Sequence, residues 1–175
     1  MGVRLPPIWL LGSSGASAQL AGSLGLGYSF ASHFSPAPAA PAMRAYRESF
    51  EPSEHFPEPH AILAVAVVCA ETEEEADYLA ATGDLIRVRL QRGEFGTIPS
   101  PEEARAYPYT AQERSVVEAY RKLHFIGTPE TILPRIENAA RESGADEVMI
   151  TTNVFGHEER LNSYRLLAEG FGRAT

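Results

Sequence analysis

A short turn near the start of the chain has residue types that suit the binding of an anion. Gly12, Ser13 and Ser14 follow four large apolar residues and precede small residues with helical spacing, a pattern typical of a buried strand, a tight turn and a helix N-terminus. The first helical turn presents backbone N–H groups without intrahelical partners at the positive end of the helix dipole. Glycine lets a ligand approach the backbone, and serine hydroxyls add donors. The sequence therefore predicts that Gly12, Ser13 and Ser14 bind a phosphate, against the alternative of a turn that only caps the helix.

Histidines offer little further chemistry. His33 follows a predicted strand and could contact a ligand there, although a loop histidine without function is the preferred interpretation. His55 and His60 have no Cys or carboxylate at metal-ligand spacing, so we expect solvated loop residues and no metal site. His124 receives no role.

The acidic residues and the single cysteine have structural explanations. Glu73, Glu74 and Glu75 lie where the first turn of a helix is expected, and carboxylates there stabilise the helix dipole. Asp146 and Glu147 suit a turn and the start of a strand. No pair of carboxylates indicates acid and base catalysis, so the catalytic residues are unknown. Cys69 ends a long apolar run and is expected to be an inert packing residue.

Composition restricts the class of protein. With 175 residues, 44% of them hydrophobic and 22% charged, the chain suits a single soluble globular domain. A net charge of -8 argues against a nucleic acid or an anionic membrane as partner, because such partners need clustered Lys and Arg. The sequence has no run of 18 apolar residues and no signal-peptide pattern at its start, so we expect a cytoplasmic protein.

Strands and helices are expected to alternate along most of the chain. The expected strands are residues 8–11, 28–31, 61–69 and 147–151, in which Tyr28 and Phe30 are assigned to the core rather than to a ligand. Five helices are expected. The first has Ala18, Ala21 and Leu24 on one face and ends at Gly25 as a left-handed cap, the second covers residues 42–50, and the third is capped by Thr72 and Glu75. The fourth covers residues 128–143 with Pro134 inside, and the fifth covers residues 158–171 with inward-facing Leu161, Tyr164, Leu167, Ala168 and Phe171. Residues 91–121 have no sustained period and are expected to form an irregular insertion with one or two short helices.

This alternation predicts an α/β fold with parallel strands and helical crossovers. Four βα units are too few for a closed eight-stranded barrel, which needs about 250 residues. The pattern therefore leaves two alternatives, an open α/β sheet or half of a barrel.

Several segments together resemble the bacterial luciferase-like flavin-dependent monooxygenases, in their C-terminal half. The resemblance covers nearly the whole chain and depends on the order and spacing of its pieces. These are residues 9–14 (WLLGSS), 25–34 (GLGYSFASHF), Tyr46, Arg47, Phe50, Pro52 and Ser53, then residues 70–76 (AETEEEA), 126–130 (IGTPE) and 144–150 (GADEVMI).

The resemblance implies a fold, a cofactor and a reaction. The fold would be the C-terminal half of a TIM (β/α)₈ barrel, here a single domain over residues 1–175. Such proteins bind reduced FMN, or a deazaflavin in some relatives, which reacts with O₂ to oxygenate a small organic substrate, and a flavin reductase can supply the reduced flavin. In the family, the segment that matches Gly12, Ser13 and Ser14 lies against the flavin phosphate, which agrees with the anion site predicted above.

A half-barrel has two uncovered sheet edges and an uncovered apolar inner face. We therefore expect the chain to form a homo-oligomer, to pair with another chain that supplies the missing N-terminal half, or to be part of a longer gene product. Two functions remain open. One is a flavin-dependent monooxygenase of which this chain is the C-terminal part, and the other is a non-catalytic relative that acts as a structural or assembly subunit.

Overall fold

A computed structural model describes residues 6–35 and 37–173. These residues fall into two compact units. Unit 1 contains the described residues up to Val65 together with Asn138–Met149, and unit 2 contains Ala66–Glu137 and the described residues from Ile150 onward. In chain order the elements are β1 (Trp9–Gly12), α1 (Gly15–Ser23), β2 (Gly27–Ala31), α2 (Ala39–Glu48), β3 (Ala61–Cys69), α3 (Glu73–Gln91), α4 (Pro101–Ala106), α5 (Ala111–Arg121), β4 (His124–Gly127), α6 (Pro129–Ser143), β5 (Glu147–Thr151) and α7 (His157–Arg173).

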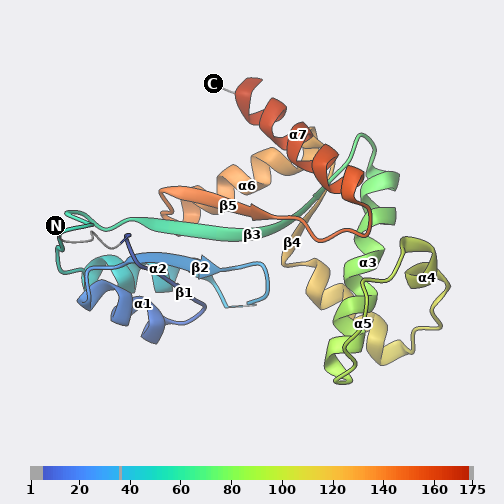
Figure 1. The fold of residues 1–175 in the computed structure, drawn as a ribbon, viewed down its shortest axis with the longest axis horizontal. Helices are drawn as coiled ribbons and strands as arrows, with labels where there is room; N and C mark the ends of the chain where they lie inside the picture. The colour runs from blue at the N-terminus through green and yellow to red at the C-terminus, as the bar shows by residue number, and fades with distance from the viewer. Residues whose placement is uncertain (1–5, 36, 174–175) are drawn as a thin grey trace. The chain divides into compact units, whose positions relative to one another are not determined.

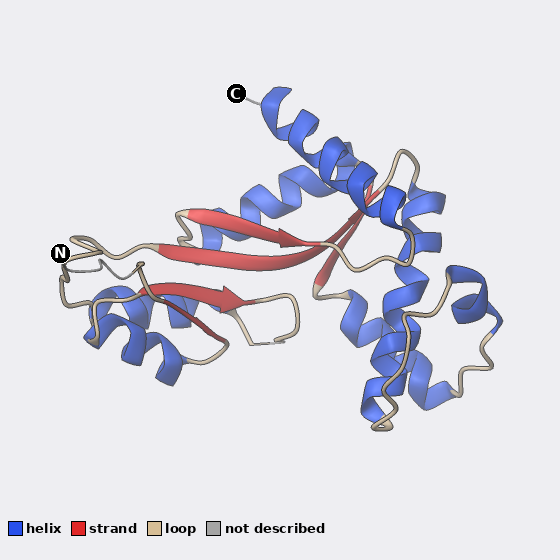
Figure 2. Cartoon of the chain, in the orientation of Figure 1, coloured by secondary structure: helices blue, strands red, loops and turns tan. Residues whose placement is uncertain are grey.

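Unit 1 is built on a parallel sheet. β1 pairs with β2, and β2 pairs with the first part of β3, both in parallel. β5 also pairs with β3, and the two arrows point the same way in Figure 2. Helices α1 and α2 lie together on one side of β2, as Figure 1 shows. The predicted α/β class with parallel strands is confirmed.

The two faces of β2 have different neighbours. Tyr28 faces α1, because its hydroxyl donates to the Ser14 carbonyl at the start of that helix. Tyr28 and Phe30 are fully buried, so their assignment to the core is confirmed. Side chains alternate along a strand, so Gly27, Ser29 and Ala31 belong to the opposite face, which we call the inner face.

The indole of Trp9 crosses Gly27 on this inner face. The two residues are register partners, and a Cβ placed on Gly27 would lie 2.5 Å from Trp9 Cδ2. The same indole makes edge contacts with the rings of Phe56 and His60, at centroid distances of 5.2 and 5.4 Å. Gly27 therefore allows a close approach that no residue with a side chain would permit.

Residues 8–11 were predicted to form a buried strand, and the prediction of burial is wrong. The strand begins at Trp9 and ends at Gly12, and the side chains of Ile8, Trp9 and Leu11 are 59%, 39% and 58% exposed. The reason is topological, because β1 stands at the end of the sheet and has β2 as its only strand partner among the described residues.

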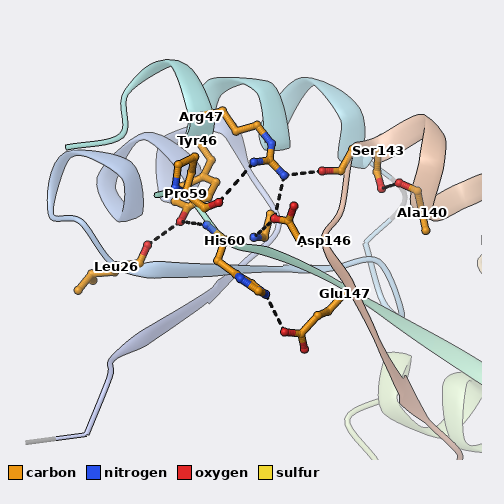
Figure 3. Close-up of polar contacts among 11 residues, drawn as sticks. Leu26, Tyr46, Arg47, Pro59, His60, Ala140, Ser143, Asp146 and Glu147 are labelled. Atoms are coloured by element: carbon orange, nitrogen blue, oxygen red, sulfur yellow. Dashed lines mark hydrogen bonds and ion pairs between the residues drawn. The ribbon is translucent and has the colours of Figure 1, made fainter. Parts of the chain in front are cut away.

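A polar cluster fastens the start of β3 to the start of β5, as Figure 3 shows. Asp146 Oδ2 accepts hydrogen bonds from the Ala61 backbone N–H at 2.7 Å and from Arg47 Nη2 at 2.9 Å. The same guanidinium nitrogen donates to the Gly144 carbonyl at 2.6 Å, and His60 Nε2 lies 2.7 Å from Glu147 Oε1. The structural assignment of Asp146 and Glu147 is confirmed.

Unit 2 combines the end of β3 with β4 and most of the later helices. Residues Ala66–Cys69 of β3 pair in parallel with β4. Arg121 at the end of α5 donates two hydrogen bonds to Asp84 Oδ2 of α3, at 3.0 and 2.7 Å, which holds the predicted insertion against α3. The insertion contains the two helices α4 and α5, as expected. Strand β4 was not among the predicted elements, since its four residues form a strand only by pairing with β3.

Two predicted helix faces are wrong in part. Leu24 is exposed because it lies beyond the last turn of α1 as its C-cap, although Ala18, Ala21 and the left-handed Gly25 are as expected. In α7 only Leu167 of the predicted inward residues is fully buried, while Leu161 and Tyr164 are exposed. The buried face of α7 includes Ser163 instead, because its hydroxyl accepts the Cys69 backbone N–H at 3.0 Å.

Candidate functional site

The turn between β1 and α1 lies at the carboxyl end of the unit 1 sheet. Gly12 ends β1, Ser13 forms the turn and Ser14 is the N-cap of α1. Gly12 and Ser13 are half-buried and Ser14 is exposed. The sequence placed all three residues between a strand and a helix, and the structure has that arrangement.

Ser14 and Ser17 fix the first turn of α1 through a reciprocal capping box. Ser14 Oγ accepts the Ser17 backbone N–H at 3.2 Å, and Ser17 Oγ accepts the Ser14 backbone N–H at 3.3 Å. The N–H groups of Gly15 and Ala16 belong to the same first turn, where helix geometry provides no acceptor. The Ser14 hydroxyl already donates to Ser17 Oγ at 3.2 Å, so an anion would meet these two N–H donors and the Ser13 hydroxyl.

Tyr28 supports the turn from the neighbouring strand. Its hydroxyl donates to the Ser14 carbonyl at 3.3 Å and lies 3.3 Å from Ser17 Oγ. Burial raises the pKa of the Tyr28 hydroxyl above its ordinary value, and the hydrogen bond with Ser17 opposes this only in part, so the hydroxyl stays protonated at neutral pH. The position of the turn is therefore coupled to β2.

The start of α1 has no negative charge of its own. Its first turn contains no acidic residue, whereas the first turn of α3 contains Glu73, Glu74 and Glu75. Those carboxylates offset the dipole of α3, as predicted for them, but nothing equivalent acts at α1. An anion at Ser14 would therefore meet a positive helix end without competition from a carboxylate of that turn.

The space around the turn differs between its two glycines. A Cβ on Gly12 would lie 2.2 Å from Ser17 Oγ, so a side chain at residue 12 would displace the capping serine. A Cβ on Gly15 would meet no atom within 4 Å. The space beside Gly15 is open, which suits the approach of a ligand to the backbone.

His33 lies at the same end of the sheet, because it follows β2 and the ends of parallel neighbours meet at one edge. Its backbone N–H donates to the Ala64 carbonyl at 3.0 Å, and its Nδ1 lies 3.4 Å from the same oxygen. The ring also contacts Phe34 edge to face. These contacts fix the imidazole near the end of β2, and a role for it in binding stays a hypothesis.

The remaining candidates do not join this turn. His60 lies in the cluster at the starts of β3 and β5, where it pairs with Glu147. His124 begins β4, and its ring lies 4.1 Å from that of Tyr120. Over residues 6–35 and 37–173, no group of three or more His, Cys, Asp or Glu side chains has the geometry to hold a metal ion.

Two contributors to the site were missed by the sequence reasoning. Ser17 was not assigned to the turn, although its spacing of three residues from Ser14 is the signal of a capping box. Tyr28 was assigned to the core alone. Its contact with Ser14 depends on how β2 aligns with β1, which spacing along the sequence does not reveal.

Comparison with known proteins places the chain among homologues. The family model described as luciferase-like monooxygenase matches residues 2–147. A luciferase-like monooxygenase of Escherichia coli strain K12 is 34% identical over 91% of this chain and 48% of its own length. The uncharacterized protein YceB of Bacillus subtilis is 40% identical over 95% of this chain and 50% of its own length. The crystal structure of apo-MsnO8 is 34% identical with a TM-score of 0.85, over 95% of this chain and 51% of that one.

Two more distant solved structures share the fold. One is the oxygenating constituent of 3,6-diketocamphane monooxygenase from Pseudomonas putida in complex with FMN, with 19% identity, a TM-score of 0.52 and coverage of 85% of this chain and 43% of that one. The other is an F420-dependent secondary alcohol dehydrogenase, with 12% identity, a TM-score of 0.56 and coverage of 95% of this chain and 49% of that one.

The chain spans about half the length of the curated relatives it matches. Among the described residues, no helix has both the length and the apolar character needed to cross a bilayer.

Proposed function

This chain belongs to the luciferase-like monooxygenase family, and on that premise we propose that it is the C-terminal part of a flavin-dependent monooxygenase. The complete protein would use reduced FMN and O₂ to oxygenate a small organic substrate. Its structural neighbours include luciferase-like TIM-barrel monooxygenases, and the chain covers 51% of the apo-MsnO8 chain, which supports the predicted half-barrel. We propose FMN rather than a deazaflavin as the cofactor, with its phosphate at the Gly12–Ser14 turn.

The geometry of the Gly12–Ser14 turn supports the binding of that phosphate. Gly15 and Ala16 would contribute N–H groups and Ser13 its hydroxyl, Ser14 would hold the turn as the N-cap, and no carboxylate of the first turn opposes an anion. The open space beside Gly15 gives access to these donors. This uncompensated helix start is the observation that carries the proposal.

A bound flavin would supply the oxygen chemistry, and the protein would supply binding and orientation. The turn would hold the phosphate, so that the rest of the cofactor extends from a fixed point. Tyr28 would keep the turn in place through its hydrogen bond to the Ser14 carbonyl. We propose no catalytic residue.

We propose a second candidate function as the alternative to this one. A non-catalytic relative that keeps the fold would serve as a structural or assembly subunit. The two candidates differ in their reaction with oxygen. Flavin-dependent consumption of reducing equivalents from NAD(P)H in the presence of O₂ and a reductase is expected of the first and not of the second.

Phosphate binding can be tested by titrating the chain with FMN and with riboflavin, which differ only in the phosphate. We expect tighter binding of FMN, measured by quenching of flavin fluorescence. The substitution Ser14→Asp keeps a good N-cap and adds a negative charge, so it should weaken FMN binding by about tenfold and leave riboflavin binding unchanged.

The matched control is Ser100→Asp, the same change at the N-cap of α4. It should leave both affinities unchanged. Equal affinities for FMN and riboflavin in the unmodified chain, or an equal loss of FMN affinity in both variants, would contradict phosphate binding at Ser14.

A further inference from the structure

An open groove lies between α6 and α7 in unit 2, and we call it the α6–α7 groove. Its volume is about 490 Å³, within the range of about 300–1,000 Å³ that is typical of small-molecule sites. All the residues that line it belong to unit 2, and none of them belongs to the Gly12–Ser14 turn. The groove is therefore a candidate binding site of its own.

Part of the α6–α7 groove is apolar, because the two helices approach each other closely there. A Cβ on Gly170 of α7 would lie 2.4 Å from Leu133 Cδ1 of α6. Leu133 and Leu166, one from each helix, line the groove and are half-buried. Their exposed parts offer a surface that a hydrocarbon chain would cover favourably.

The α6 side of the groove carries carboxylates without a partner. Glu130 and Glu137 lie seven residues apart, so they share the helix face of Leu133 at a spacing of two turns, about 10.5 Å. Both side chains are exposed, and within the part of the chain that the structure describes neither makes a hydrogen bond or an ion pair. Pro134 lacks an N–H, so the Glu130 carbonyl also loses its usual helical donor. This wall of the groove offers acceptors and negative charge.

The α7 side does not compensate that charge. Arg165 is the one cationic residue among the described residues that line the groove, which include four glutamates. Its guanidinium lies 2.9 Å from Glu169 Oε1 and 3.6 Å from Glu71 Oε1. Arg165 is thus engaged by two other carboxylates, and the charges of Glu130 and Glu137 stay uncompensated.

We infer that the α6–α7 groove binds a small organic diammonium ion, two protonated amines joined by a hydrocarbon chain. The chain covers Leu133 and Leu166, and one ammonium group lies at each of Glu130 and Glu137. Charge complementarity decides between ligand classes, because an anion would meet four carboxylates and a neutral chain would leave them without donors. The volume of the groove favours a free diamine over a protein segment. This inference goes beyond the proposed function and does not depend on it.

The test is a titration of the chain with octamethylenediamine, a diamine with a chain of eight carbons, at physiological ionic strength. Calorimetry gives the affinity, and nuclear magnetic resonance of the ¹⁵N-labelled chain locates the site. We expect saturable binding that shifts the amide signals of Leu166 and Gly170. Putrescine is too short to reach both carboxylates, and suberate has the same number of carbons but two negative charges. Each should bind at least about tenfold more weakly.

The double variant Glu130→Gln, Glu137→Gln removes both charges and keeps the size of the side chains, so it should weaken octamethylenediamine binding by about tenfold. The matched control is Glu58→Gln, Glu74→Gln, which removes two charges from exposed glutamates outside the groove and should leave the affinity unchanged. Circular dichroism verifies the fold of both variants.

Three results would overturn the inference. They are suberate binding as tightly as the diamine, an equal loss of diamine affinity in both double variants, and absence of a shift at Leu166 and Gly170. A peptide with two lysines separated by leucines that binds through the same glutamates at least tenfold more tightly would overturn the choice of a free diamine. None of these readouts involves flavin, so they leave the proposed function untouched.

Discussion

Asp146 makes three hydrogen bonds, two through one carboxylate oxygen and one through its backbone N–H. That oxygen accepts the Ala61 N–H and the Arg47 guanidinium, and the Asp146 N–H itself donates to the Ala61 carbonyl at 2.8 Å. Charge-assisted hydrogen bonds of this kind are stronger than neutral ones. The residue is therefore an anchor for the start of β5.

We expect Asp146→Ala to lower the free energy of unfolding by about 1–3 kcal/mol, because the Ala61 N–H and Arg47 each lose a charged acceptor. Urea denaturation followed by circular dichroism measures the change. Glu58→Ala is the control, since Glu58 is an exposed carboxylate of the same unit. Equal stabilities of the two variants would show that Asp146 contributes no more than an ordinary surface acid.

At the scale of elements, a carboxylate connects the start of α3 with the start of α6. Glu73 Oε1 accepts the Thr131 hydroxyl at 2.7 Å and the Thr128 backbone N–H at 3.1 Å. These hydrogen bonds, that of Thr131 first, lower the pKa of Glu73 below its ordinary value of 4.5. Glu73 thus accepts hydrogen bonds from the start of α6 and also stabilises the dipole of its own helix, α3.

The lowered pKa predicts how stability depends on pH. The ionised form of Glu73 is favoured in the folded chain, so its contribution is complete above about pH 4.5 and is lost as the pH falls through the lowered pKa. Glu73→Gln should therefore destabilise the chain at pH 7, and the difference from the unmodified chain should shrink towards acid pH. Thermal unfolding from pH 7 down to pH 3 measures this. Glu74→Gln, the exposed neighbour, should show no such convergence.

Elements with a strong local signal could be predicted from the sequence. The apolar run of residues 61–69 predicted β3 with its observed bounds, and the pair Thr72 and Glu75 predicted the cap of α3. Features that depend on distant partners could not be predicted. Strand β4 exists through pairing with β3, and the buried face of α7 is set by the bond between Ser163 and Cys69.

The candidate site follows the same division. The order strand, turn, helix around Gly12, Ser13 and Ser14 was visible in the sequence, because glycine and serine after an apolar run are local signals. The contact of Tyr28 with the turn was not, because it depends on the register of two strands. Phosphate binding itself stays a prediction.

For the molecule as a whole, Cys69 provides a reporter of unfolding. Its side chain is 1% exposed, and burial, aided by the Glu130 and Glu73 carboxylates, raises the pKa of the thiol to about 11. The thiolate is the reactive form, so the native chain should react with Ellman's reagent at pH 8 at least about a hundredfold more slowly than the unfolded chain. The reaction should accelerate with urea along the same transition as the circular dichroism signal.

The control is a Cys69→Ala, Ser115→Cys double variant, which moves the thiol to an exposed position on α5. It should react rapidly without urea. Rapid modification of Cys69 in the native chain, before any change in circular dichroism, would show that the end of β3 opens without global unfolding.

The contact between Trp9 and Gly27 ties two positions of the sequence to each other. With the indole where it is, residue 27 has no room for even a methyl group. A lineage that acquires a larger residue at position 27 must first lose the bulk at position 9. We therefore expect positions 9 and 27 to covary among homologues, with a large residue at one of them accompanied by a small residue at the other.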